Sequence, residues 1–182
     1  MEKNSTRFTI LLFFILSVVI TCREKGQDTG RYDEQNYIEV SRGNWKGYYT
    51  ITYESKNDSN NKMRILFADS TQNHVFYMKE FFTNDIMNGP MYVFSQDKLS
   101  MKGFMLNNKR HGELTFFNPD STISDRNFYD NGLKTGVWEH FSINGILIRK
   151  TYYERGNFIK HEIFDRDGKY VRTRYRENLY DN

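Results

Sequence analysis

Four histidines, His74, His111, His140 and His161, are the side chains best suited to metal binding or acid–base chemistry in this 182-residue chain. A metal site would need several of them to converge, each oriented by a further hydrogen bond. Their positions match no metal-ligand spacing motif. We therefore predict no metal site and no cofactor. His140 and His161 share a face of the repeat described below, and a small metal-dependent hydrolase that uses them is the weaker alternative.

An acidic column, Asp97, Asp120, Asn144 and Asp167, offers oxygen ligands of the kind that calcium prefers. Asp and Asn are also favoured in tight turns for their backbone preferences, and a glycine directly follows two of these residues. We therefore interpret the column as turn residues. No serine lies in a Gly-x-Ser-x-Gly elbow, and no glycine-rich phosphate loop is present. The sequence thus predicts a protein that is not an enzyme.

The single cysteine, Cys22, is the residue with the clearest covalent chemistry. A basic start is followed by an apolar run over residues 8–20, which is shorter than the about 20 residues of a spanning helix and is typical of a secretory signal. The run ends in Val19-Ile20-Thr21-Cys22, which resembles a bacterial lipobox. This resemblance implies cleavage before Cys22 and attachment of a diacylglyceryl group to its sulfur. An ordinary signal peptide with an incidental cysteine is the alternative.

The leader and its flank predict a cellular address. Residues 1–21 are predicted to be a lipoprotein signal peptide, and the polar residues 22–36 a flexible tether. Two or more acyl chains anchor a protein stably. Residue 23 is Arg, not the Asp that retains many lipoproteins in the inner membrane, so we expect a lipid-anchored protein of the bacterial outer membrane that faces the periplasm. The net charge of +3 is too small to indicate nucleic-acid binding.

The elements that position these residues are copies of one repeat. Phe94, Phe117, Phe141 and Phe164 are separated by 23, 24 and 23 residues, and the acidic column lies three residues after each of them. Eleven residues after each phenylalanine come Met105, Phe128, Tyr152 and Tyr175. Five residues before come Gly89, Gly112, Gly136 and, as an exception, Ile159. Three residues before each phenylalanine come Met91, Leu114, Trp138 and His161. These aligned columns indicate a structural repeat.

Each unit reads as two antiparallel strands and two turns. Asn144-Gly145 and Asp167-Gly168 predict two-residue hairpin turns of type I′, because both central residues of that turn need a positive φ. Polar loops, such as Leu106–Gly112 and Tyr153–Asn157, are expected to reverse the chain at the other end. A single hairpin is only marginally stable, so we expect the units to stack through rows of aromatic side chains.

The repeat resembles the MORN repeat, and it is most similar to the bacterial YwqK-like variant, whose members are often labelled antitoxin components. The stretches that carry the resemblance are NDIMNGPMYVF, NNKRHGELTFF, DNGLKTGVWEHF and FSINGILIRKTYYERGNF, within residues 84–177. Only Gly136, Trp138 and Phe141 complete the Gly-x-Trp-x-x-Phe core. The resemblance implies an elongated antiparallel sheet that serves as a scaffold or binding surface.

We therefore predict an all-β protein: an antiparallel meander of repeated β-hairpins in a single elongated sheet. Residues 37–83 are expected to form the first strands and cap the four repeats of 84–177, and 178–182 a tail. Trp138, Tyr152, His140 and His161 are the candidate binding surface, unless the aromatic rows pack only on each other and on the cap. The leading hypothesis is a non-catalytic envelope lipoprotein that binds a protein or glycan. A toxin-neutralising or immunity lipoprotein is the alternative.

Overall fold

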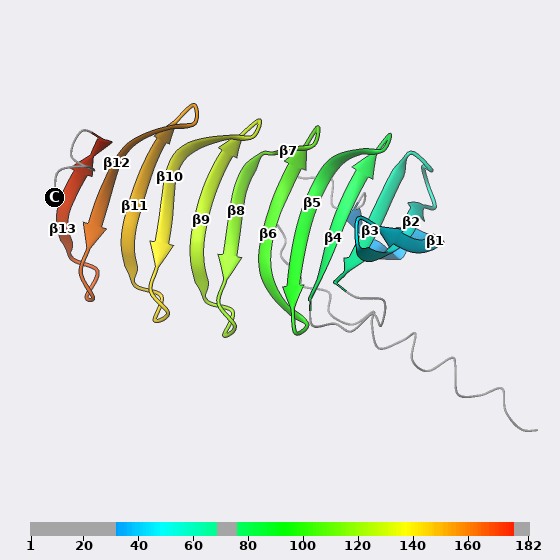
Figure 1. The fold of residues 1–182 in the computed structure, drawn as a ribbon, viewed down its shortest axis with the longest axis horizontal. Helices are drawn as coiled ribbons and strands as arrows, with labels where there is room; N and C mark the ends of the chain where they lie inside the picture. Colours follow the sequence, from blue (N-terminus) through cyan, green and yellow to red (C-terminus); the bar gives the residue numbers. More distant parts are fainter. Residues whose placement is uncertain (1–31, 69–75, 177–182) are drawn as a thin grey trace, which may run out of the picture.

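The computed structural model describes residues 32–68 and 76–176, and these residues form a single open antiparallel sheet (Figure 1). Thirteen strands follow one another in chain order, except that the short β7 pairs only with β6. The predicted all-β meander is therefore confirmed. Among the described residues, no helix is long and apolar enough to cross a membrane. Cys22, the leader 1–21, His74 and the tail 178–182 lie outside the described residues.

The strands are regular and mostly six to ten residues long. Their bounds are β1 Tyr37–Trp45, β2 Tyr48–Ser55, β3 Asn61–Phe67, β4 Phe76–Thr83, β5 Ile86–Ser95, β6 Lys98–Leu106, β7 Lys109–Arg110, β8 Gly112–Phe117, β9 Ile123–Asp130, β10 Leu133–Phe141, β11 Leu147–Glu154, β12 Asn157–Phe164 and β13 Tyr170–Tyr175. A short 3₁₀-helix, η2 (Glu34–Asn36), precedes β1.

The register of the strands reproduces the repeat. A β-bulge lies directly before Phe94, Phe117, Phe141 and Phe164 in the hairpins β5–β6, β8–β9, β10–β11 and β12–β13. Each phenylalanine then pairs with the first or second residue of the next strand: Leu99, Ile123, Leu147 or Tyr170. A bulge adds one residue to a strand and bends it. In every repeat the extra residue lies in the strand after the turn, opposite the step into the phenylalanine: Ser100, Ser124, Ile148 or Val171.

The turns differ from the sequence prediction. Asn144-Gly145 and Asp167-Gly168 do not form two-residue turns: Ser142 N donates to Ile146 O and Asp165 N to Lys169 O, which leaves three residues in each loop. Only the glycine of each pair has a positive φ, 75° and 78°. This is a type I turn followed by a left-handed residue, and Asn-Gly or Asp-Gly satisfies it as well as it satisfies type I′.

The two-residue turns lie mainly where polar loops were predicted, at the other edge of the sheet. Both central residues have positive φ in Lys46-Gly47, Asn84-Asp85, Gln96-Asp97, Asn107-Asn108, Asn131-Gly132 and Arg155-Gly156. Of these, only Gln96-Asp97 belongs to the acidic column. One edge of the array therefore carries tight type I′ turns, and the other carries mostly three-residue loops.

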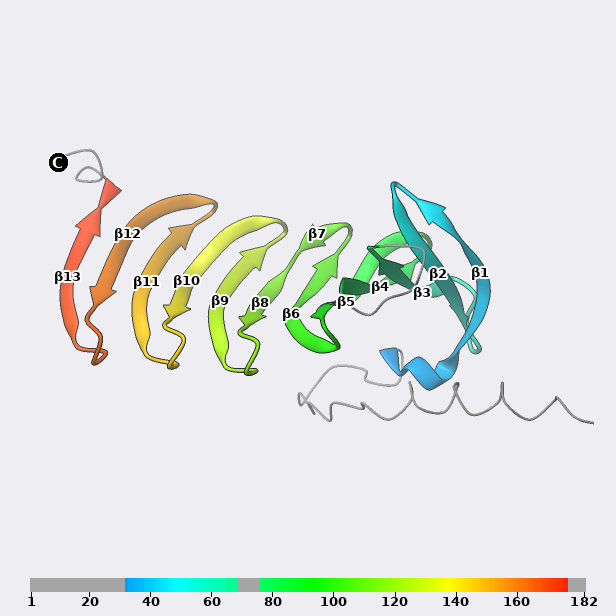
Figure 2. The same ribbon diagram turned by 60° about the horizontal axis from the view of Figure 1, so that its bottom comes forward.

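The hydrophobic core is concentrated in the N-terminal half, where β1 and β2 curl over the following strands (Figure 2). One cluster consists of Tyr37, Met63 and Phe81 with partly buried neighbours, and a second consists of Met91, Leu114 and Tyr129. Within β10–β13 only Thr151 is buried. The last two repeats are thus a single layer with both faces open to solvent.

The predicted tether 22–36 is too long at its C-terminal end. Tyr32 packs edge-on against Phe81 and Phe104, with ring centroids 5.3 and 6.5 Å apart, and Glu34 pairs with Lys79 at 2.7 Å. Gly89 makes room for this contact, because a Cβ there would lie 2.7 Å from the Tyr32 ring. Residues 32–36 therefore belong to the folded domain.

Candidate functional site

The two faces of the C-terminal sheet carry different side chains. Successive residues of a strand point to opposite faces, and directly paired residues point to the same one. Trp138, Thr151 and His161 are paired in succession across β10, β11 and β12. We call the face that they share the groove face. The opposite face, which carries Glu139, Tyr152 and Glu162, is called the paired face.

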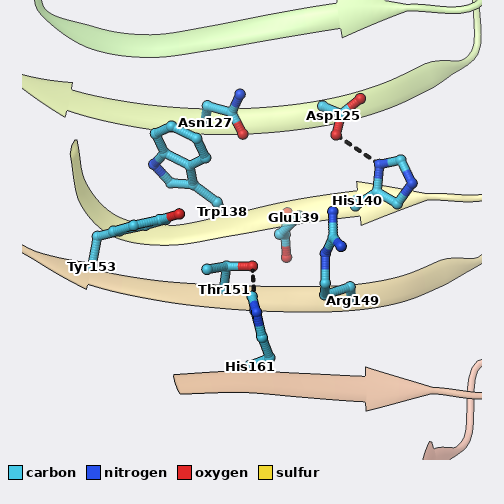
Figure 3. A pocket seen from close by; sticks show the side chains of 9 residues that line it. All are labelled: Asp125, Asn127, Trp138, Glu139, His140, Arg149, Thr151, Tyr153 and His161. Atoms are coloured by element: carbon cyan, nitrogen blue, oxygen red, sulfur yellow. Dashed lines mark hydrogen bonds and ion pairs between the residues drawn. The ribbon is translucent and has the colours of Figure 1, made fainter. Parts of the chain in front are cut away.

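A shallow groove of about 270 Å³ lies on the groove face across β9–β12 (Figure 3). Its lining residues are Asp125, Asn127, Trp138, Glu139, His140, Arg149, Thr151, Tyr153 and His161, of which Glu139 alone belongs by strand alternation to the paired face. Three of the four residues of the predicted binding surface, Trp138, His140 and His161, therefore line one hollow. Because the nine lining residues come from the four adjacent strands β9–β12, the groove exists only when the repeats are stacked.

An aromatic row forms one side of the groove. Ring centroids are 5.2 Å apart from Tyr129 to Trp138, 4.8 Å from Trp138 to Tyr153, 6.1 Å from Tyr153 to Phe158 and 4.5 Å from Phe158 to His161. The indole Nε1 of Trp138 donates to the carbonyl oxygen of Phe128 at 3.0 Å, which fixes the ring. The ammonium of Lys134 lies over both Trp138 and Tyr153, at 4.6 and 5.0 Å from their ring centroids.

The two groove histidines have separate partners. His140 Nδ1 lies 2.7 Å from Asp125 Oδ1, and His161 Nδ1 lies 3.0 Å from Thr151 Oγ1 (Figure 3). Burial lowers the pKa of His161 from its ordinary value of 6.5, and the positive charges of Arg149 and Arg174 lower that pKa further. His161 is therefore neutral at pH 7, with the positive charges of two arginines close to it.

The groove is better arranged for binding than for metal chemistry. The two histidines sit on β10 and β12, with β11 between them, and their ring nitrogens have different hydrogen-bond partners. No group of three or more His, Cys, Asp or Glu side chains that could hold a metal ion occurs within residues 32–68 and 76–176. The aromatic row and the cationic side chains offer instead apolar contact and charge-assisted hydrogen bonds.

The paired face neutralises its own charges. Glu139 lies 3.3 Å from Arg126 and 4.0 Å from Lys150. Glu162 accepts hydrogen bonds from Lys160 Nζ and the Tyr152 hydroxyl, both at 2.6 Å, and the hydrogen bond from Lys160 is the main cause of its lowered pKa. Tyr152, the fourth residue of the predicted surface, is therefore separated from the other three by the thickness of the sheet.

The remaining predicted residues have structural positions. Phe94 stacks on Tyr77 with ring centroids 4.7 Å apart, and Phe141 lies under the guanidinium of Arg126. In the acidic column, Asp120 accepts hydrogen bonds from the backbone and hydroxyl of Thr122, which lowers its pKa. The sequence prediction missed Asp125, Arg149, Thr151 and Tyr153. Alternation places them on the groove face only once the register of β9 and β11 with β10 is known.

Comparison with known proteins does not assign the chain to a family. No family model and no curated protein matches it. Among solved structures, it is similar to a mutant of S. aureus TarM in complex with fondaparinux, alpha-GlcNAc-glycerol and UDP, with a TM-score of 0.33 and 16% identity over 86% of this chain. The chain spans 24% of the length of that protein. At this level of similarity neither family nor ligand carries over.

Proposed function

We propose that this protein is a non-catalytic lipoprotein of the bacterial envelope that acts as a scaffold or binding module through its repeat-built sheet. The lipid on Cys22 anchors it in the outer membrane, and the MORN-like repeats face the periplasm. Its partner is a protein or a glycan. The sheet provides the binding surface, and no reaction takes place on it.

The observation that carries this proposal is the contrast between the two faces of β10–β13. The paired face holds each of its central carboxylates against a cation or a hydroxyl group. The groove face leaves an aromatic row beside exposed arginines, and among the described residues no second layer covers it. Aromatic and arginine side chains together are typical of binding hot spots.

The described chain enters the sheet at some distance from the groove. Tyr32, its first residue, packs on Phe81 of β4 and Phe104 of β6, whereas the groove covers β9–β12. With strands about 4.8 Å apart, the four strand intervals from β4 to β9 place the groove roughly 19 Å along the sheet from the point where Tyr32 packs.

A photocrosslinking experiment in cells tests the binding role. A photoreactive amino acid replaces Arg172, on the groove face, or the neighbouring Thr173, on the paired face, because adjacent residues of β13 point in opposite directions. We expect a discrete crosslinked species only from position 172. Equal products from both positions, or none from either, would contradict the proposal.

The anchor is tested separately by metabolic labelling with a fatty-acid analogue. We expect Cys22→Ser to abolish the label and to release the protein from the membrane fraction, since the thioether forms on the Cys22 sulfur. Cys22 is the only cysteine of the chain, so no other thiol can accept the lipid. Label that persists in this variant would refute the lipoprotein assignment.

A further inference from the structure

The groove face becomes strongly basic toward the C-terminal end of the sheet. Two rows of directly paired residues cross it from β10 to β13. The first row is His140, Arg149, Ile163 and Arg172, and the second is Trp138, Thr151, His161 and Arg174. The three arginines are exposed. None of them forms an ion pair with any residue of the described ranges 32–68 and 76–176.

The acidic residues of the same strands do not balance these charges. Glu154 and Glu162 each follow a groove-face residue, Tyr153 and His161, so their side chains point to the paired face. On β9, Asp125 is engaged by His140. Across β11–β13 the groove face therefore presents arginines without a carboxylate. This segregation of charge favours a negatively charged occupant, because an anion would offset the mutual repulsion of the arginines.

The spacing of the basic residues favours an extended ligand. Arg149 and Arg174 sit on β11 and β13, so their backbones are at least about 9.6 Å apart, and each row from β10 to β13 spans about 14 Å. A single small anion would contact only one arginine. A chain with repeated negative charges can contact both arginines while its body lies along the aromatic row.

We propose that the groove binds a linear acidic polysaccharide, with sugar rings against Trp138 and Tyr153 and carboxylate groups on Arg149 and Arg174. This proposal rests on the binding function proposed above and specifies its ligand. Planar guanidinium groups pair with carboxylates through two parallel hydrogen bonds. Aromatic rings offer flat apolar contact to the C–H faces of sugars. Both contacts run across the strands, in the direction of the groove.

The ring geometry disfavours a nucleic acid in this groove. Bases stack face to face on open aromatic platforms. Trp138 and Tyr153 are instead tilted by 52° with respect to each other, and Lys134 lies over both. This arrangement leaves partial ring surfaces bordered by cations, which suits sugars that carry acidic groups.

Isothermal titration calorimetry with the purified protein tests the proposal. The probe is an oligogalacturonate, which carries one carboxylate per sugar, and its fully methyl-esterified form is the control with the same backbone. We expect binding of the acid and none of the ester at the same concentration. Binding should weaken as salt is raised, because exposed ion pairs are screened. Equal affinity for acid and ester, or no binding of the acid, would overturn the proposal.

Matched variants on the two faces locate the binding site. Arg149→Gln should weaken binding about fivefold, whereas Lys150→Gln, its neighbour on the paired face, should leave affinity unchanged. Tyr153→Ala should weaken binding about tenfold or more and Tyr152→Ala should not. Thermal unfolding of each variant shows whether the fold is kept. Equal effects of the members of a pair would refute the site.

Polyphosphate serves as a polyanion without sugar rings. We expect weaker binding that is insensitive to Tyr153→Ala, since polyphosphate cannot use the ring contact. Polyphosphate that binds as tightly as oligogalacturonate would overturn the polysaccharide assignment. If photocrosslinking from position 172 succeeds while oligogalacturonate fails to bind, the binding function stands and the ligand proposed here is wrong.

Discussion

Gly103 and Leu114 form the contact on which the joint between the first two repeats depends. A Cβ placed on Gly103 would lie 2.6 Å from Leu114 Cδ1, so the leucine occupies the space that a side chain on β6 would need. Leu114 is only 3% exposed and packs with Met91 and Tyr129. The strand ladder here is short, with two directly paired positions between β6 and β8. Side-chain packing therefore has to stabilise this joint.

Leu114→Ala and Gly103→Ala should each destabilise the protein. The loss of unfolding free energy in the double variant should be smaller than the sum of the two single losses. Leu114→Ala leaves a cavity and should cost about 3 kcal/mol. Gly103→Ala forces Leu114 from its position and should cost about 1–2 kcal/mol. With Leu114 truncated, the new methyl group on β6 fills part of the cavity and restricts the unfolded chain, which is worth about 0.5–1 kcal/mol. Gly103→Ala should therefore change sign and become stabilising in the Leu114→Ala background.

Urea unfolding followed by tryptophan fluorescence and by far-UV circular dichroism measures these free energies. Coincident transitions from the two probes are required before two-state free energies are compared, because repeat arrays can lose cooperativity. Gly43→Ala is the matched control, since a Cβ at that strand position meets nothing within 4 Å. Effects that add within about 0.5 kcal/mol would refute the packing argument. So would a Gly103→Ala variant as stable as Gly43→Ala.

Three other predictions concern a turn, an ion pair and a tyrosine. Ser121 has a φ of 71° at the loop position that Gly145 fills in the next repeat, so Ser121→Gly should raise the unfolding free energy by about 1 kcal/mol; a decrease in urea titration would contradict this. Glu80→Ala strands the Arg64 guanidinium, 2.7 Å from the buried carboxylate, and should cost about 3 kcal/mol. Adding Arg64→Met should recover most of that loss, and further destabilisation would refute the argument. Burial raises the pKa of Tyr77 to about 12, so stability should fall as pH rises above 10, the ordinary value, and ultraviolet titration should lose a late transition in Tyr77→Phe.

The repeat was visible in the sequence because its columns are backbone requirements. The phenylalanine column coincides with the bulge in all four units, and Gly112 and Gly136 take a positive φ that other residues rarely adopt. The type of turn could not be read in the same way. Asn-Gly suits both a type I′ turn and a type I turn with a bulge, and the bulge before Phe141 decides between them.

The binding surface could be predicted only in part. Trp138, His140 and His161 were found because they stand out within repeat columns, and alternation does place them on one face. Tyr152 was chosen for its aromatic ring, although it points to the other face, where Glu162 binds its hydroxyl group. Arg149 was overlooked because one arginine in a charged sequence has no distinctive signal. Its role depends on which residues of β12 and β13 are paired beside it, and that register is a property of the fold.

One repeat column connects the core of the protein with its groove. Met91 and Leu114 are buried, whereas Trp138 and His161, at the same position of the next two units, are partly exposed and hydrogen-bonded. A buried polar group needs a partner, and the carbonyl of Phe128 and the hydroxyl of Thr151 supply these partners within the sheet. Terminal repeats need a polar outer surface, since no further unit covers them. The groove of the last two repeats therefore lies at the position that the hydrophobic core occupies in the first two. No second layer covers the last two repeats, so a ligand can reach the groove from solvent.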